Sequence, residues 1–193
     1  IEQLPEDLVK AYSGCGCPLA EVKLKGDEVV IDFGAGAGID SFLAATRLPR
    51  GIVLSVDFTP EMMLTSHTKI TLNQVLRIAA DIERMPLFDQ LADLIIANSS
   101  FNLTTNKPRA FAEAYRLLKP NGRLVMSDLI HEGDLPREII EDPLAYTSSL
   151  GGVISKIELE DMLAAAGFKD IRILNFKAFS YVTAVSIEAR RLF

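Results

Sequence analysis

A glycine-rich segment follows a short apolar run in the first fifth of the chain. It reads Asp32-Phe33-Gly34-Ala35-Gly36-Ala37-Gly38, with three glycines at alternate positions. Glycine has no Cβ, so it lets a backbone turn tightly and approach a ligand closely. The spacing G-x-G-x-G differs from the G-x-G-x-x-G of dinucleotide-binding domains. Taken alone, such a loop is also explained as a plain connection between a strand and a helix.

Two acidic residues follow the next two apolar runs. Asp57 comes after residues 51–56, and Asp81 comes after residues 74–79. A carboxylate at the first position can accept hydrogen bonds from both hydroxyls of a ribose, and one at the second can accept from the amine of adenine. Ile82 can then lie against the adenine ring. Each residue alone is also explained as a helix cap or a solvated loop charge, but with the glycine loop they predict a nucleoside site.

The elements that must position these residues alternate between short apolar runs and amphipathic stretches. This alternation predicts an α/β fold with a Rossmann-like, doubly wound, mostly parallel sheet. Ligands bind at the carboxyl ends of the strands in such sheets, where the loop and the two acidic residues should meet. The predicted strands are 28–33, 51–56, 74–79, 91–97, 123–129, 170–176 and 181–189, and the predicted helices are 39–48, 60–71, 108–118 and 157–166.

Local signals mark several element ends. Ser155 and Glu158 form the pattern of a capping box before the last predicted helix. Pro120 should stop the helix before it, and Asn121-Gly122 is typical of a turn before the fifth strand. No helix separates the last two strands, so a short loop joins them and they should run antiparallel. The prediction is a parallel sheet with a final antiparallel strand.

Composition limits the class of partner. The 193 residues carry a formal net charge of −6, and the basic residues are scattered. Both nucleic-acid binding and adsorption to an anionic membrane favour a basic face, so neither partner is expected. No apolar run approaches the ~18 residues of a membrane-spanning helix, and no signal peptide is visible. Two cysteines, Cys15 and Cys17, cannot form a disulfide framework, so we expect reduced thiols and a cytoplasmic setting.

The ordered set of glycine loop, Asp57 and Asp81 resembles the nucleoside-binding pattern of class I S-adenosylmethionine-dependent methyltransferases. The resemblance implies S-adenosylmethionine as the cofactor. In it, Asp32 orients the glycine loop and the methionine end, and Asn98 lies close to the methionyl part and the reacting methyl. The cofactor-binding residues that it implies are Asp32, Gly34, Ala35, Gly36, Gly38, Asp57, Phe58, Asp81, Ile82 and Asn98.

Further segments resemble arsenite methyltransferases. The similar stretches are Tyr12-Ser13-Gly14-Cys15-Gly16-Cys17-Pro18, Asn98-Ser99-Ser100-Phe101-Asn102-Leu103 and Leu150-Gly151-Gly152. The likeness covers roughly residues 12–174. It implies one methyltransferase domain over residues 1–193, with an N-terminal lid (residues 1–25), a substrate-side insert (residues 131–154) and a small-molecule methyl acceptor.

The cysteines depart from that pattern. The family binds trivalent arsenic through several thiolates, which suit a soft ion. Cys15 matches one of them, but Ser149 stands where the family has another, and Ala35 replaces a cysteine of its glycine loop. No cysteine follows Cys17. The interpretation favoured here is a methyl acceptor other than arsenite; the alternative is a smaller C-x-C site for a thiophilic ion. No metal site is predicted, because two cysteines do not complete a tetrahedral zinc site.

Three residues are candidates for the catalytic site: Asn98, Asp128 at the end of the fifth strand, and Cys15 as a thiol near the methyl donor. Two other functions stay open. One is a non-catalytic S-adenosylmethionine-binding module or regulatory subunit of the same fold. The other is a nicotinamide-dependent oxidoreductase, which the loop spacing and the Asp81 segment disfavour. The sequence leaves the oligomeric state open.

Overall fold

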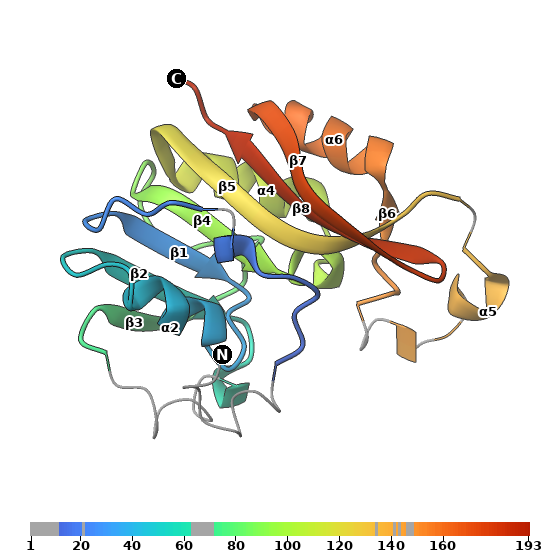
Figure 1. Ribbon diagram of the computed structural model, residues 1–193, viewed down its shortest axis with the longest axis horizontal. Coiled ribbons are helices and arrows are strands. Elements are labelled where there is room, and N and C mark those ends of the chain that lie inside the picture. Colours follow the sequence, from blue (N-terminus) through green and yellow to red (C-terminus); the bar gives the residue numbers. More distant parts are fainter. Residues whose placement is uncertain are drawn as a thin grey trace.

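The computed structural model describes residues 12–20, 22–62, 72–133, 135–140, 142, 144–145 and 149–193. Within them, eight strands form one sheet whose order is β3-β2-β1-β4-β5-β8-β7, with β6 paired to β5 (Figure 1). The strands are β1 (Val29–Phe33), β2 (Ile52–Asp57), β3 (Val75–Ala79), β4 (Ala92–Asn98), β5 (Leu118–His131), β6 (Ile154–Ser155), β7 (Lys169–Phe179) and β8 (Val182–Arg190). The helices are α2 (Ile39–Ala45), α4 (Lys107–Leu117), α5 (Arg137–Ile140) and α6 (Lys156–Ala165), with 3-10 turns η1 (Pro18–Ala20) and η2 (Phe101–Leu103).

The sheet has the predicted mixed topology. β1 pairs in parallel with β2 on one side and with β4 on the other, so the strand order reverses between β1 and β4. A crevice forms at such a reversal, beyond the carboxyl ends of the strands. β8 runs antiparallel to both β5 and β7. The last strand of the chain is therefore the antiparallel one, inserted between β5 and β7, and the predicted parallel sheet with a final antiparallel strand is confirmed.

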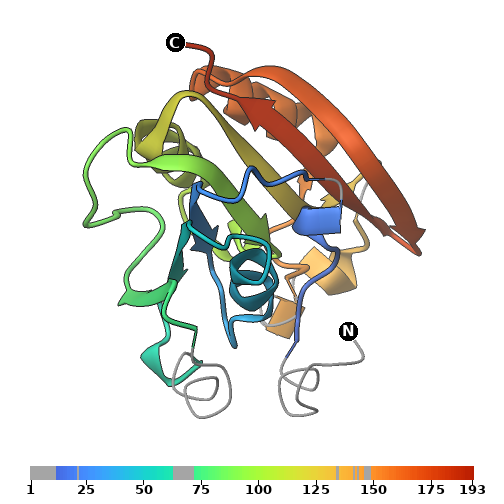
Figure 2. The same cartoon turned by 60° about the vertical axis from the view of Figure 1, so that its left-hand side comes forward.

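Helices cover both faces of the sheet because the central strands are apolar on both sides. Val30 of β1 packs in a cluster with α2 and η1, whereas its neighbour Ile31 packs in a second cluster with α4 and α6. Figure 2 shows α2 in front of the sheet and α4 and α6 behind it. This sandwich fixes β1 and β4 rigidly, so the loops at their carboxyl ends start from well-defined positions.

The capping signal before α6 was correct, and the predicted turn before the fifth strand lies inside that strand. Ser155 and Glu158 form the predicted capping box of α6, with both reciprocal bonds present. Asn121-Gly122, however, lies within β5, which starts at Leu118 rather than at residue 123. The ladder with β4 continues on both sides of it, and Asn121 takes up the irregularity with a φ of 65°. Residues 119–122 stand opposite a single residue of β4, Asp93, so the turn residues interrupt the ladder inside the bounds of β5.

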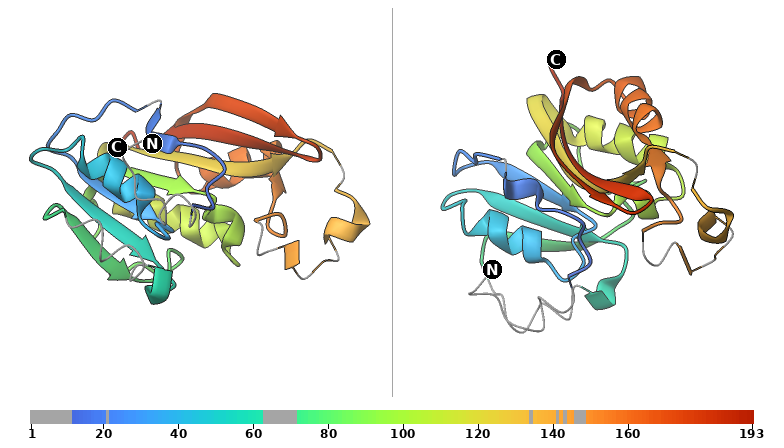
Figure 3. Two further views of the ribbon diagram at one scale, coloured as in Figure 1. Left: turned by 60° about the horizontal axis from the view of Figure 1, so that its bottom comes forward. Right: turned by 45° about the vertical axis from the view of Figure 1, so that its right-hand side comes forward.

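Parts of three predicted segments, the second helix, the lid and the insert 131–154, fall outside the described residues. Pro60 to Met62 are helical, but residues 63–71 of the expected helix 60–71 lie outside the description, as do residues 1–11 of the expected lid. The insert holds α5, which extends away from the sheet (Figure 3), and β6. No helix in the described parts of the chain is both long enough and apolar enough to cross a membrane.

Candidate functional site

Two adjoining cavities lie at the carboxyl ends of the central strands. The large cavity measures about 560 Å³ and the small cavity about 40 Å³. Both are lined by Ser13, Gly34, Gly36 and Asn98, so they form one continuous site. This is the crevice where the strand order reverses, the position expected for a ligand in an open α/β sheet.

The glycine loop between β1 and α2 needs its glycines. Gly34, Gly36 and Gly38 have φ angles of 68°, 53° and 84°, a region that residues with a Cβ rarely adopt. At Gly34 space is also lacking, because an added Cβ would lie 2.4 Å from the Cβ of Ser100. The loop therefore packs backbone against the chain that follows β4. Gly38 is the N-cap residue of α2 and does not line either cavity.

Asp57 at the end of β2 fastens this loop. Its carboxylate accepts a hydrogen bond from the backbone N–H of Gly36 at 2.7 Å and another from Thr59 at 2.8 Å. A carboxylate offers about four lone-pair positions, so the half-buried side chain can still accept from a ligand. Phe58 beside it is exposed and stands at the rim of the large cavity.

Asp81 and Ile82 line the large cavity from the loop after β3. Asp81 is exposed, and its Oδ1 accepts a hydrogen bond from Glu83 N at 2.8 Å, which fixes the turn. Ile82 is buried in the hydrophobic core and presents only part of its side chain to the cavity. Glu83 accepts from the backbone N–H of Thr105 at 2.7 Å, so the loops that face each other across the cavity are tied together.

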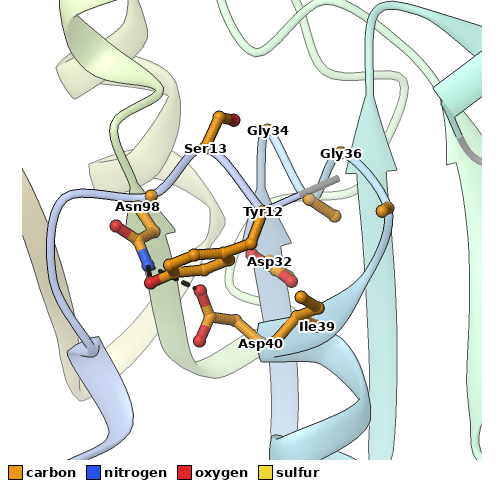
Figure 4. Close-up of a pocket in the computed structure, with 11 residues that line it drawn as sticks. Tyr12, Ser13, Asp32, Gly34, Gly36, Ile39, Asp40 and Asn98 are labelled. Carbon is orange, nitrogen blue, oxygen red and sulfur yellow. Dashed lines mark hydrogen bonds between the residues drawn. The ribbon is translucent and has the colours of Figure 1, made fainter. Parts of the chain in front are cut away.

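The small cavity has an acidic lining (Figure 4). Asp32 is 1% exposed, and its Oδ2 accepts a hydrogen bond from Ser41 Oγ at 2.6 Å. Burial, followed by the nearby Asp40, raises the pKa of Asp32 well above its usual value. Burial likewise raises the pKa of Asp40. Because these carboxylates have lost much of their water, the cavity favours a ligand group with positive charge.

Asn98 at the end of β4 holds residues 12–17, called here the covering segment, over the small cavity. Its Nδ2 donates to Tyr12 Oη and Asp40 Oδ2 at 2.8 Å each, and to Gly16 O at 2.9 Å. Its Oδ1 accepts from the backbone N–H of Cys15 at 3.0 Å and of Gly16 at 3.3 Å. Burial raises the pKa of Tyr12 to about 12, so the phenol stays neutral.

Cys15 and Asp128 do not line either of these cavities. Cys15 lines a third cavity of about 160 Å³ together with Cys17 and Ser127, and burial raises the pKa of its thiol to about 11. Asp128 is 2% exposed and accepts hydrogen bonds from the backbone N–H of Asn102 at 3.1 Å and of the residue that follows it. Burial raises its pKa to about 7. The roles assigned to these two residues stay predictions.

Sequence reasoning missed Asp40 and Ser100. Asp40 follows the last glycine of the loop by two residues, where an acidic side chain is ordinarily explained by the helix dipole. Ser100 is buried, and its Oγ has no hydrogen-bond partner among the described residues. Its Cβ occupies the space that a side chain at position 34 would need. Ser100 is brought to the glycine loop only by the fold, and the hydrogen bond between Asp40 and Asn98 likewise joins residues far apart in sequence.

Known proteins resemble this chain over most of its length. A methyltransferase domain model matches residues 24–167. An arsenite methyltransferase of Halobacterium salinarum is 35% identical over 164 residues, covering 83% of this chain and 42% of that protein. A malonyl-[acyl-carrier protein] O-methyltransferase of Geobacter sulfurreducens is 27% identical over 165 residues, covering 79% of this chain and 60% of that protein. The structure of an arsenic (III) S-adenosylmethionine methyltransferase from Chlamydomonas reinhardtii has a TM-score of 0.85 at 26% identity, covering 100% of this chain and 71% of that one.

The chain spans about half the length of the curated arsenite methyltransferases that it matches. The match to the domain model covers the strands β1 to β5 and the glycine loop, which together build the two cavities.

Proposed function

The chain belongs to the class I S-adenosylmethionine-dependent methyltransferases, and on that premise we propose that it methylates a small molecule in the manner of arsenite methyltransferases. The observation that carries the proposal is the continuous pair of cavities, one flanked by the loops that hold Asp57 and Asp81 and the other lined by Asp32 and Asp40. The larger one has the size of a cofactor pocket.

The residues present fit the cofactor. The glycine loop turns through three left-handed residues, of which Gly34 and Gly36 line both cavities, so its backbone is open to a ligand there. Asp57 would accept the ribose hydroxyls, and Asp81 would accept the adenine amine with Ile82 beside the ring. Asn98 and the acidic small cavity would face the methionyl part, whose ammonium and sulfonium groups are positive.

The cofactor, when bound, supplies a methyl group already activated on a sulfonium. The chain therefore has to align the acceptor and exclude water rather than activate the methyl. Aligning two reactants at a separation of ~3–3.5 Å can by itself lower the barrier by several kcal/mol. The covering segment, pinned by Asn98, would exclude water from the methionyl end. The four described residues that line both cavities, Ser13, Gly34, Gly36 and Asn98, include no charged base, so the acceptor should bring its own nucleophile.

The acceptor proposed here differs from arsenite. Ser149 stands where the resemblance expects a cysteine, and its hydroxyl is a poor ligand for a soft ion. Cys15 keeps its proton at neutral pH because burial raises its pKa to about 11. A thiophilic ion would have to displace that proton with few other thiolates to hold it.

Binding calorimetry with S-adenosylhomocysteine tests the cofactor site. We expect binding by the wild-type chain and none by Asp57→Ala, which removes the ribose acceptor and the fastening of Gly36. Asp161→Ala on the exposed side of α6 is the matched control and should bind normally. If the wild-type chain gives no heat with this ligand or with S-adenosylmethionine, the proposal is wrong. A fluorescence titration with reduced nicotinamide cofactor should show no binding.

A turnover assay tests the transfer itself. The chain is incubated with S-adenosylmethionine and, in turn, a thiol, an oxyanion such as arsenite, and small organic acceptors, and S-adenosylhomocysteine is measured by mass spectrometry. Product above the level without acceptor supports the enzyme. Retained binding with no product from any class would instead favour a non-catalytic binding module, a function compatible with Asp128 being occupied by backbone bonds.

A further inference from the structure

Strand β7 forms one margin of the sheet and is exposed along most of its length. It pairs with β8 on one side, and no strand in the described parts of the chain pairs with its other side (Figure 2). Its side chains include Ile173, which is 39% exposed, Phe176, which is 72% exposed, and Phe179, which is 42% exposed. β7 has eleven residues and no proline. A long apolar edge strand of this kind offers backbone N–H and C=O groups to another chain.

An irregularity inside β7 places its two halves on matching faces. In a regular strand, residues five positions apart point to opposite faces of the sheet. In β7, the register with β8 shifts just after Ile173. Phe176 therefore lies opposite Val185 of β8, which belongs to the hydrophobic cluster beneath α4 and α6. Ile171 packs against the same cluster, so Ile171 and Phe176 share one face although five positions separate them.

Two copies of β7 that pair antiparallel must oppose residues of the same face, because a slip by one residue turns every side chain to the wrong side. A register that sets Ile171 opposite Phe176 of the second copy meets this condition, and only the irregular pair at its centre, Ile173 and Leu174, departs from it. A two-fold axis relates the copies, so each contact forms twice. The exposed Phe176 of each copy would then be covered by the isoleucines of the other.

The charges of β7 favour the same register. Asp170 then stands opposite Lys177 of the second copy, and opposite charges across an antiparallel pair attract. The two-residue shift that keeps matching faces would instead bring Arg172 opposite Lys177, and like charges so placed are destabilising. Within the described residues Asp170 makes no ion pair, and the Lys177 ammonium lies over the ring of Phe179 at 5.0 Å rather than on a carboxylate.

We propose that β7 is the contact between two copies of this chain, which join edge to edge into one continuous sheet. The occupant of the edge is a second copy rather than an unrelated strand, because the apolar and the charged residues of β7 are complementary to themselves. No residue of β7 lines either of the two adjoining cavities at the glycine loop. The pairing therefore leaves the proposed cofactor site open, and the inference does not depend on the proposed function.

A charge-reversal experiment tests the register by sedimentation velocity over a roughly hundredfold range of protein concentration. The wild-type chain should form a dimer. Lys177→Glu sets two acids against each other in both pairs and should weaken the dimer about ten- to a hundredfold. Asp170→Lys combined with Lys177→Glu restores opposite charges and should return the affinity to within about threefold of the wild-type value. Lys23→Glu, at an exposed residue before β1, is the matched control and should change nothing.

A second variant tests the apolar contact without changing any charge. Phe176→Ser removes the ring that would pack on Ile171 of the second copy, and should weaken the dimer about tenfold. Phe88→Ser is the matched control, because Phe88 is also exposed but lies in the loop between β3 and β4. Thermal unfolding of each variant at low concentration shows whether the fold of the single chain is kept.

Three results would overturn the proposal. A wild-type chain that stays monomeric over the whole concentration range does not use β7 to bind a second copy. A dimer that both Lys177→Glu and Phe176→Ser leave intact is held together by another surface. A dimer that Lys177→Glu weakens and the double reversal fails to restore does not have the antiparallel register. If Lys177→Glu fails to fold, the comparison of Phe176→Ser with Phe88→Ser decides.

Discussion

Gly34 and Gly36 both need the backbone freedom of glycine, but only Gly34 also lacks space for a side chain. Both have left-handed φ angles, which cost alanine about 1–2 kcal/mol. At Gly36 the nearest atom to an added Cβ is Met62 Cε at 3.8 Å, an ordinary contact. At Gly34 the added Cβ would lie 2.4 Å from the Cβ of Ser100, and such overlap costs a further ~1–3 kcal/mol.

We therefore expect Gly34→Ala to lower the free energy of unfolding by ~2–5 kcal/mol and Gly36→Ala by only ~1–2 kcal/mol. Urea denaturation of the chain without cofactor measures both values. The Ser100→Gly substitution removes the obstructing Cβ. In the Gly34→Ala background it should therefore restore the share of the free energy of unfolding that was lost through the overlap.

A double-mutant cycle of Gly34→Ala and Ser100→Gly isolates this overlap, because its coupling energy excludes the cost of the φ angle. The expected coupling is favourable by ~1–3 kcal/mol. Gly36→Ala combined with Ser100→Gly is the control and should be additive within ~0.5 kcal/mol. Equal losses at the two glycines together with zero coupling would refute the argument that Ser100 dictates the glycine at position 34.

Two further predictions concern titration. Asp32 and Asp128 have pKa values raised by burial to about 8 and about 7, against 3.8 ordinarily. The stability they contribute is thus complete below about pH 4 and is lost as the pH rises to about 8, by up to ~1.4 kcal/mol per group and pH unit. Urea titrations should show the chain less stable at about pH 8 than at about pH 5, and the reverse slope would contradict the assignment. In a Cys17→Ser variant, alkylation of Cys15 by iodoacetamide should accelerate roughly tenfold per pH unit up to its pKa of about 11; a plateau near neutral pH would contradict a buried thiol.

The central strands and the glycine loop could be predicted because their signals are local. Each short apolar run ends at a loop residue that the sheet places at the same edge, so the order of Gly34, Asp57 and Asp81 along the chain already indicates a site. β5 shows the limit. Asn121-Gly122 has the local chemistry of a turn, and Asn121 does adopt a left-handed φ, but Leu118 already pairs with β4 before it. That long-range pairing, which no local signal shows, starts the strand five residues earlier than predicted.

The hydrogen-bond network of the small cavity could not be predicted, because its partners are far apart in sequence. Asn98 contacts Tyr12 and Asp40 across separations of 86 and 58 residues. Nothing local distinguishes an asparagine that binds a ligand from one that fastens a segment. The same holds for Asp128, whose position at a strand end indicates a site although its carboxylate is taken up by the backbone of η2.

The amide group of Asn98 has two hydrogens for three acceptors, Tyr12 Oη, Gly16 O and Asp40 Oδ2. Tyr12 Oη also donates to Gly16 O, so all three acceptors are satisfied while the covering segment lies over the small cavity. A positive ligand group in that cavity would therefore meet a network that already joins Asp40 to the covering segment. Thermodynamic reciprocity requires that any stabilisation of the covering segment by a bound cation equals the gain in cation affinity that the segment provides. Asn98 bonds both Asp40 and the covering segment, so such a coupling would act through its side chain.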